Sequence, residues 1–196
     1  MKKSLATIAA ACLLLAAGCR MQVNKNSDGS EKNVKIDTPI GGLHVRSGDT
    51  KAADVGLPVY PGASVAPDKD GDKSADVHMG FGEWQLRVKV VNYHSSDSQD
   101  KILAFYQKAL GRYGDVIRCQ DGRATGTPAV TQEGLGCTDD NGKAHIEISD
   151  GLSLKAGSKH HQHIVGIEKE NGPGTRFALV ELQLPAALDK DSSKSE

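Results

Sequence analysis

The chain is poor in aromatic side chains and has no excess of either charge. Only one Trp, four Tyr and three Phe occur in 196 residues, which leaves few rings for stacking on sugars or bases. Lysine and arginine number 24 against 25 aspartate and glutamate, and this balance argues against nucleic-acid binding. With 22 glycines, the composition favours a modest core with many turns, more β than helical. We expect no nucleic-acid partner.

Sequence motifs of common catalytic sites are also missing. The chain has no Gly-x-Ser-x-Gly turn, no Ser-x-x-Lys, no Gly-rich phosphate loop and no dinucleotide fingerprint. Catalytic groups can still be brought together by the fold alone, so a small hydrolase stays open as an alternative. We expect a protein that is not an enzyme, with no catalytic residue and no cofactor.

One long apolar run is present, and it lies at the start of the chain. Lys2 and Lys3 precede apolar residues from Leu5 to Ala17, and Cys19 follows soon after. This arrangement is typical of a secretory signal peptide. The run of about 13 residues is shorter than the roughly 20 that span a bilayer, which argues against a transmembrane helix.

Leu15-Ala16-Ala17-Gly18-Cys19 resembles the lipobox of bacterial lipoproteins, although Ala16 stands where Leu is commonest. The resemblance implies removal of residues 1–18, acylation of Cys19 with palmitate-type chains, and anchoring in the cell envelope. Arg20 follows the cysteine where Asp would favour the inner membrane, so we expect the outer membrane, with the leaflet left open. The alternative is an ordinary signal cut near Ala17, which would leave a free thiol at Cys19.

The use of cysteine agrees with export. Cys12 lies in the signal and Cys19 takes the lipid, which leaves Cys119 and Cys137 in an oxidising compartment. A disulfide between these two closes a loop of about 18 residues, worth about 3 kcal/mol. The alternative is a redox pair, but the usual Cys-x-x-Cys spacing is absent. We predict a structural disulfide between Cys119 and Cys137.

Composition divides the mature chain into four parts. Residues 19–33 are polar and predict a flexible tether, and 34–56 predict short strands and a linker. Residues 57–184 form the main domain, and 185–196 predict a disordered tail.

Hydrophobic periodicity predicts an α+β fold, with an antiparallel sheet and one main amphipathic helix over about 98–112. The expected strands of the main domain are 75–81, 84–90, 115–119, 143–148, 152–155, 161–168 and 175–184. In the second of these, we expect Gln85, Arg87 and Lys89 on the far, solvated face of the sheet. In the last, the residues expected to face the core are Ala178, Val180, Leu182 and Leu184.

Two segments of the main domain resemble a group of uncharacterised exported bacterial proteins. They are LPVYPGA at 57–63, read as a first strand, and SSDSQDKILAFYQKAL at 95–110, read as a helix with a Phe-Tyr pair. The resemblance covers about 57–184. It implies a fold but no activity and no catalytic residues.

His160-His161-Gln162-His163 is the most concentrated group of metal-ligand residue types. On a strand, His161 and His163 point the same way and could bind Zn²⁺ or Cu²⁺ with a third ligand, His145 or Glu147, from a neighbouring strand. The alternative is three solvated histidines, and their spacing matches no known metal motif. We expect no metal site, and His161, His163 and His145 are the candidates should there be one.

These observations favour a non-catalytic, lipid-anchored envelope protein that presents a small domain to a protein or another envelope component. The alternatives are a metal-binding or metal-sensing lipoprotein that uses the histidine cluster, and a small hydrolase.

Overall fold

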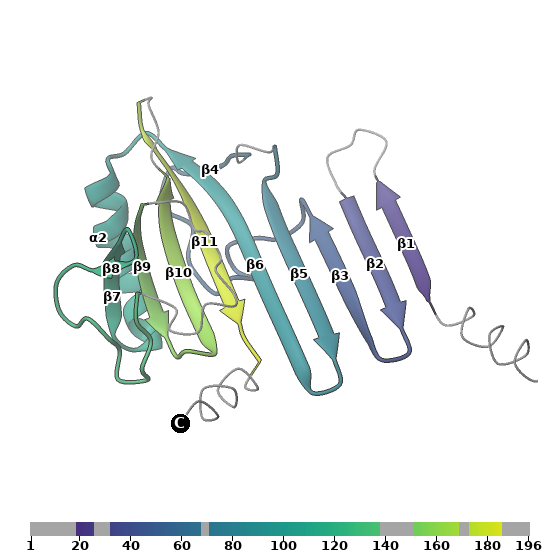
Figure 1. Ribbon diagram of the computed structural model, residues 1–196. Helices are drawn as coiled ribbons and strands as arrows, with labels where there is room; N and C mark the ends of the chain where they lie inside the picture. Colours follow the sequence, from purple (N-terminus) through teal and green to yellow (C-terminus); the bar gives the residue numbers. More distant parts are fainter. Residues whose placement is uncertain (1–18, 26–31, 68–70, 138–150, 169–172, 186–196) are drawn as a thin grey trace, which may run out of the picture.

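The computed structural model describes residues 19–25, 32–67, 71–137, 151–168 and 173–185. They form one eleven-stranded antiparallel sheet and one α-helix (Figure 1). The strand order is β1-β2-β3-β5-β6-β11-β10-β9-β7-β8, and β4 pairs with β6 beside this path. The strands are β1 (Arg20–Lys25), β2 (Lys32–Thr38), β3 (Gly41–Ser47), β4 (Ser64–Val65), β5 (Ser74–Phe81), β6 (Trp84–Ser95), β7 (Val116–Gln120), β8 (Arg123–Ala124), β9 (Leu152–Gly157), β10 (His161–Glu168) and β11 (Thr175–Gln183).

The predicted helix is confirmed as α2 (Gln99–Leu110), continued by the 3₁₀ turn η1 (Gly111–Tyr113). Ser98 has the extended backbone of an N-cap, and Asp100 in the first turn complements the helix dipole. The helix packs with one apolar stripe on one face of the sheet, which we call the helix face; the opposite one is the back face. The buried residues of the stripe are Ile102, Leu103, Tyr106 and Leu110.

The main core lies between α2 and the helix face of β6, β11, β10 and β9. Phe177 is fully buried at its centre, with the rings of Tyr93 and Tyr106 at 5.7 and 5.6 Å. The segment between β3 and β4 adds Val55 and Leu57 to the same core. This segment therefore belongs to the packed domain, although its composition suggested a linker.

The expected orientation of β6 is wrong. Lys89 pairs with Glu181, and the next residues on the same face, Val91 and Tyr93, pack in the core beneath α2. Gln85, Arg87 and Lys89 thus lie on the helix face and not on the far face. Val88 and Val90 lie on the back face. The prediction failed because apolar residues occupy both faces of β6 between Val88 and Tyr93, so periodicity alone does not show which face meets the helix.

The last strand shows the same ambiguity. In β11, Phe177 and Leu179 face the helix, whereas Ala178, Val180 and Leu182 lie on the back face. Ala178 and Val180 are nonetheless buried there, in a second small cluster with Ile164. The prediction that the even-numbered residues face the core beneath the helix is therefore wrong, although Ala178, Val180 and Leu182 are buried and Leu184 is partly buried.

Four strands extend the sheet beyond β6 in the order β5, β3, β2, β1, and we call them the sheet extension. β2 and β3, predicted as separate short strands, belong to the same sheet because β3 pairs with β5 along its whole length. Residues 20–25, expected in a flexible tether, form the edge strand β1. The antiparallel sheet and the single α-helix are as predicted. With eleven strands against one helix in the described residues, however, the fold is mostly β.

Cys119 and Cys137 form the predicted disulfide, with their Cα atoms 5.5 Å apart. Among the described residues, no helix has the length and apolar character needed to cross a membrane. Three predictions fall outside the described residues: the signal peptide over 1–18, the strand over 143–148, and all but the first residue of the C-terminal tail.

Candidate metal centre

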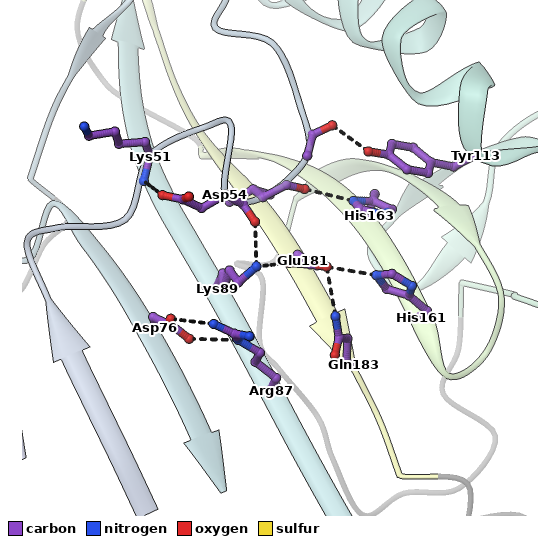
Figure 2. A network of polar contacts seen from close by, with 12 residues as sticks. Lys51, Asp54, Asp76, Arg87, Lys89, Tyr113, His161, His163, Glu181 and Gln183 are labelled. Carbon is purple, nitrogen blue, oxygen red and sulfur yellow. Dashed lines mark hydrogen bonds and ion pairs between the residues drawn. The ribbon is translucent and has the colours of Figure 1, made fainter. Parts of the chain in front are cut away.

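A row of polar side chains crosses the helix face where the cover of α2 ends. The strand register places His163 of β10 opposite Glu181 of β11, Glu181 opposite Lys89 of β6, and Lys89 opposite Asp76 of β5. His161 lies one step along β10 on the same face. Figure 2 shows His161 and Lys89 approaching Glu181 from opposite sides.

Glu181 is the centre of the cluster. Its Oε1 lies 3.0 Å from His161 Nε2 and accepts a hydrogen bond of 3.0 Å from Gln183 Nε2. Its Oε2 accepts a hydrogen bond of 2.6 Å from Lys89 Nζ. The residue is only 8% exposed, so burial by itself would raise its pKa. The bonds from Lys89, His161 and Gln183 outweigh burial and lower the pKa to about 2, which keeps the carboxylate charged.

His163 is held in one orientation by its surroundings. Its Nδ1 lies 3.0 Å from the Val55 carbonyl oxygen, and the Tyr113 ring stacks on it with centroids 3.6 Å apart. A carbonyl can only accept, so Nδ1 carries the proton, and in the neutral ring the lone pair is on Nε2. The ring is 4% exposed. Burial, followed by the proximity of His161, lowers the pKa of His163 and favours the neutral form.

The segment that supplies the Val55 carbonyl is fastened on both sides. Before it, Asp54 Oδ2 accepts a 2.9 Å bond from the Lys51 amide, and the Asp54 carbonyl accepts one of 2.6 Å from Lys89 Nζ. After it, the Gly56 carbonyl accepts a 2.6 Å bond from the Tyr113 hydroxyl. Gly56 has φ +77°, and a Cβ there would lie 2.5 Å from that hydroxyl oxygen. Glycine is therefore required at this position.

His161, His163 and Glu181 together offer two imidazoles and one carboxylate. One ligand atom of each lies within 4.8 Å of the other two, and they are the only such group of three that the described residues contain. Two nitrogens and an oxygen suit Zn²⁺, Cu²⁺ or Ni²⁺ better than Ca²⁺ or Mg²⁺. The Val55 bond on His163 is the outer contact that metal-binding histidines usually have.

The sequence named two of these three residues as candidate ligands, although it predicted no metal site. His161 and His163 share a face as predicted, with ring centroids 5.0 Å apart. The proposed third ligands, His145 and Glu147, lie outside the described residues. Glu181 was missed, although the antiparallel pairing of β10 with β11 brings it opposite His163.

A second histidine pair serves as a comparison. His44 and His78 are register partners on the sheet extension, with ring centroids 6.3 Å apart. Asp37 lies beside them, with Oδ1 3.1 Å from His44 Nε2. Both rings of this pair are more exposed to solvent than His163. Among their described contacts, neither ring has a hydrogen bond to a backbone carbonyl that would fix its orientation.

A cavity of about 480 Å³ lies beside the disulfide and is lined in part by Cys137 and Lys159. Among the described residues, its charged lining is Arg123 and Lys159, with no histidine and no carboxylate. These groups do not make an acid–base pair, so the cavity gives the hydrolase alternative no support.

The chain matches no known protein-family model, no curated protein and no solved structure.

Proposed function

We propose that this is an exported, lipid-anchored protein that binds one divalent transition-metal ion through His161, His163 and Glu181. The observation that carries the proposal is the convergence of these three side chains from β10 and β11. Two of the three are buried, and His163 is held neutral and oriented before any ion binds. A site that is oriented in advance loses little conformational entropy on binding.

Each ligand has a defined role. His163 would coordinate through Nε2 while Nδ1 keeps its bond to Val55. Glu181 would offer Oε1, and His161, which contacts that oxygen, would turn its Nε2 to the ion. Three protein ligands leave the fourth tetrahedral position for water or a further ligand.

Lys89 is the group that opposes a cation here. Its ammonium lies 2.6 Å from Glu181 Oε2 and therefore offsets part of the carboxylate charge. The same bond fixes the carboxylate and leaves Oε1 directed toward the histidines (Figure 2). We expect Lys89 to weaken the affinity while it positions the ligand.

Export and anchoring rest on the lipobox at residues 15–19. The disulfide between Cys119 and Cys137 supports an oxidising compartment. Cys19 is exposed at the start of β1, where modification of its thiol is sterically open. We propose the outer membrane, because Arg20 follows the cysteine.

The test is isothermal titration of the chelator-treated protein with ZnCl₂, and in parallel with CuCl₂. We expect one ion per chain. His161→Ala, at a half-exposed position, and His163→Gln should each lower the affinity at least about tenfold. The double variant His44→Gln/His78→Gln should leave it unchanged. Equal affinity in the wild type and both site variants, each checked for folding by circular dichroism, would exclude the site.

A second candidate function is a non-catalytic role in which the sheet extension binds another envelope component. The supporting observation is its helix face, where the polar side chains of Lys35, His44 and His78 stand in register on neighbouring strands. Arg87 of β6 continues this row. A photo-crosslinking residue at Lys35 would join a specific partner in cells, whereas one at Val59, outside the extension, would not. Equal crosslinking at both positions would argue against this role.

A further inference from the structure

We infer that the back face of the sheet extension and β6 lies flat against the lipid bilayer in which Cys19 is anchored. The inference rests on the proposed acylation of Cys19 and adds what that anchor does to the orientation of the domain. Its basis is the position of Cys19 relative to an apolar sheet face.

The strand register shows that Cys19 lies at a corner of this face. Arg20 of β1 pairs with Asp37 of β2, which sets the preceding residue, Cys19, level with Thr38. From Thr38 the register continues through Gly41 and Phe81 to Trp84. Figure 1 shows the start of β1 and the turns β2–β3 and β5–β6 at the same end of the sheet.

Two rows of this face are apolar across all five strands. One step up from Cys19, a row of register partners runs from Met21 to Leu86 across five strands. The row above it is Val23, Val34, Val45, Val77 and Val88. All ten positions of these two rows are aliphatic or methionine, so neither row places a charge in hydrocarbon. The next row places Lys25 and Lys32 at its outer edge, farther from Cys19.

Much of this face remains exposed. Met21 is 67% exposed, Val23 49% and Phe81 46%, and the inner strands are only half-buried. No helix of the described chain crosses β1, β2, β3 or β5 (Figure 1). A contiguous exposed apolar surface of this kind marks an interaction site.

The occupant is a bilayer because the anchor and the face coincide. Acyl chains on Cys19 enter the membrane directly beside Met21, and the described chain leaves no tether between the anchor and β1. At the same end of the face, the Phe81 and Trp84 rings form a pair with centroids 6.0 Å apart. Tryptophan prefers the boundary between headgroups and hydrocarbon. Apolar contact also adds to the acyl chains as a second source of membrane affinity.

The opposite face of the same strands suits water. Arg46 of β3 and Asp76 of β5 are register partners there, and Arg87 makes two bonds to the Asp76 carboxylate, of 3.2 and 2.9 Å. Flat binding on the back face would therefore leave the metal cluster and the helix on the side away from the lipid.

Trp84, the single tryptophan of the chain, reports directly on this orientation. The acylated protein is purified, its acylation is established by intact mass, and it is reconstituted into phosphatidylethanolamine–phosphatidylglycerol vesicles that contain brominated lipid. We expect a blue-shifted Trp84 emission and strong quenching by the bromine atoms.

A matched pair of variants separates flat from end-on contact. In a Trp84→Phe background, Val45→Trp places the reporter on the back face and Arg46→Trp places it on the helix face of the same strand. Quenching of the first and not of the second is the expected result. Quenching of Trp84 alone would mean end-on contact and would overturn the inference, as would no quenching in an acylated protein.

Two further outcomes count against the inference and differ from each other. A mass without acyl chains would refute the anchor, and the orientation that rests on it would fall with it. A stable dimer of the Cys19→Ser protein in sedimentation, with Trp84 shielded from aqueous quenchers, would show that a second copy covers the face instead.

Discussion

The helix-covered half of the molecule and the sheet extension belong to one sheet but differ in how its two faces are used. Strand β6 lies where the two halves meet. On its helix face Arg87 and Lys89 form ion pairs, whereas Val91 and Tyr93, a few residues later, are buried beneath α2. The helix face is thus apolar where the helix covers it and polar where the cover ends.

The comparison shows which half of the fold gains more stability from buried side chains. In the covered half, side chains are buried on both faces of β10 and β11, as in a protein interior. In the extension, four strands have one polar face and one half-exposed apolar face. The candidate metal cluster lies on the line between the two, where strand register is fixed by the core and polar groups are still close to water.

The largest expected loss of stability follows a substitution in the core of the helix-covered half. Phe177→Ala removes a fully buried ring that contacts three aromatic neighbours, and should lower the free energy of unfolding by about 3–5 kcal/mol. Val45→Ala removes a half-buried side chain of the extension and should cost about 1 kcal/mol or less. Urea unfolding followed by circular dichroism measures both. Equal costs would mean that the extension is packed as tightly as the core.

The next effect concerns the far end of the covered half. Replacement of Cys119 and Cys137 by serine opens a loop of 18 residues in sequence separation and should lower the unfolding free energy by about 3 kcal/mol. The matched comparison is the wild type with and without reductant. The same urea midpoint in both would show that the disulfide does not stabilise the fold.

The pH dependence of stability tests the contribution of Glu181, which lies where the two halves meet. Glu181 has a folded pKa of about 2 against an ordinary 4.5, so its charge stabilises the fold above pH 4.5 and this contribution is lost as the pH falls toward 2. Glu181→Gln should cost about 2 kcal/mol at pH 7 with chelator present, because the largely buried ammonium of Lys89 then loses its charged partner.

The cost of Glu181→Gln should shrink as the pH falls from about 4.5 toward 2, and urea unfolding at several pH values measures it. Glu168→Gln is the control, since Glu168 is more exposed and its pair with Arg176 spans 3.7 Å. A cost for Glu181→Gln that does not change with pH would contradict the role given to this carboxylate.

The smallest effect belongs to the polar face where β6 pairs with the first strand of the extension, β5. Arg87→Gln removes a paired contact with Asp76, but the arginine side chain is 42% exposed and solvent screens the pair. We expect a loss of about 0.5–1 kcal/mol that decreases in 1 M NaCl. Thermal unfolding at low and high salt provides the measurement. A loss above about 2 kcal/mol would place this pair among the interactions of the core.

How much of this could be predicted from sequence differs between the two halves. Alternation predicted most of the described strands, and the three-and-four spacing predicted α2, because each of these patterns reports a local period. The facing of β6 and β11 was wrong because both faces are apolar near Val90, Val91 and Val180. Only the position of the helix decides which face is which, and that is a tertiary property.

The candidate site shows the same limit. The shared face of His161 and His163 follows from the two-residue period of a strand. Glu181 comes from a different strand and Val55 from a loop more than a hundred residues away, so only the folded chain brings them together. Residues 20–25 looked like a tether because they are mostly polar, but pairing with β2 makes them a strand.

The central claim is that His161, His163 and Glu181 form a metal site. X-ray absorption at the zinc edge of the protein loaded with one equivalent of Zn²⁺ tests this claim most directly. The account predicts two imidazole ligands with Zn–N distances of about 2.0–2.1 Å, reduced to one in His163→Gln. The result that contradicts it is a spectrum with water oxygens alone, or one that is identical in the wild type and His163→Gln.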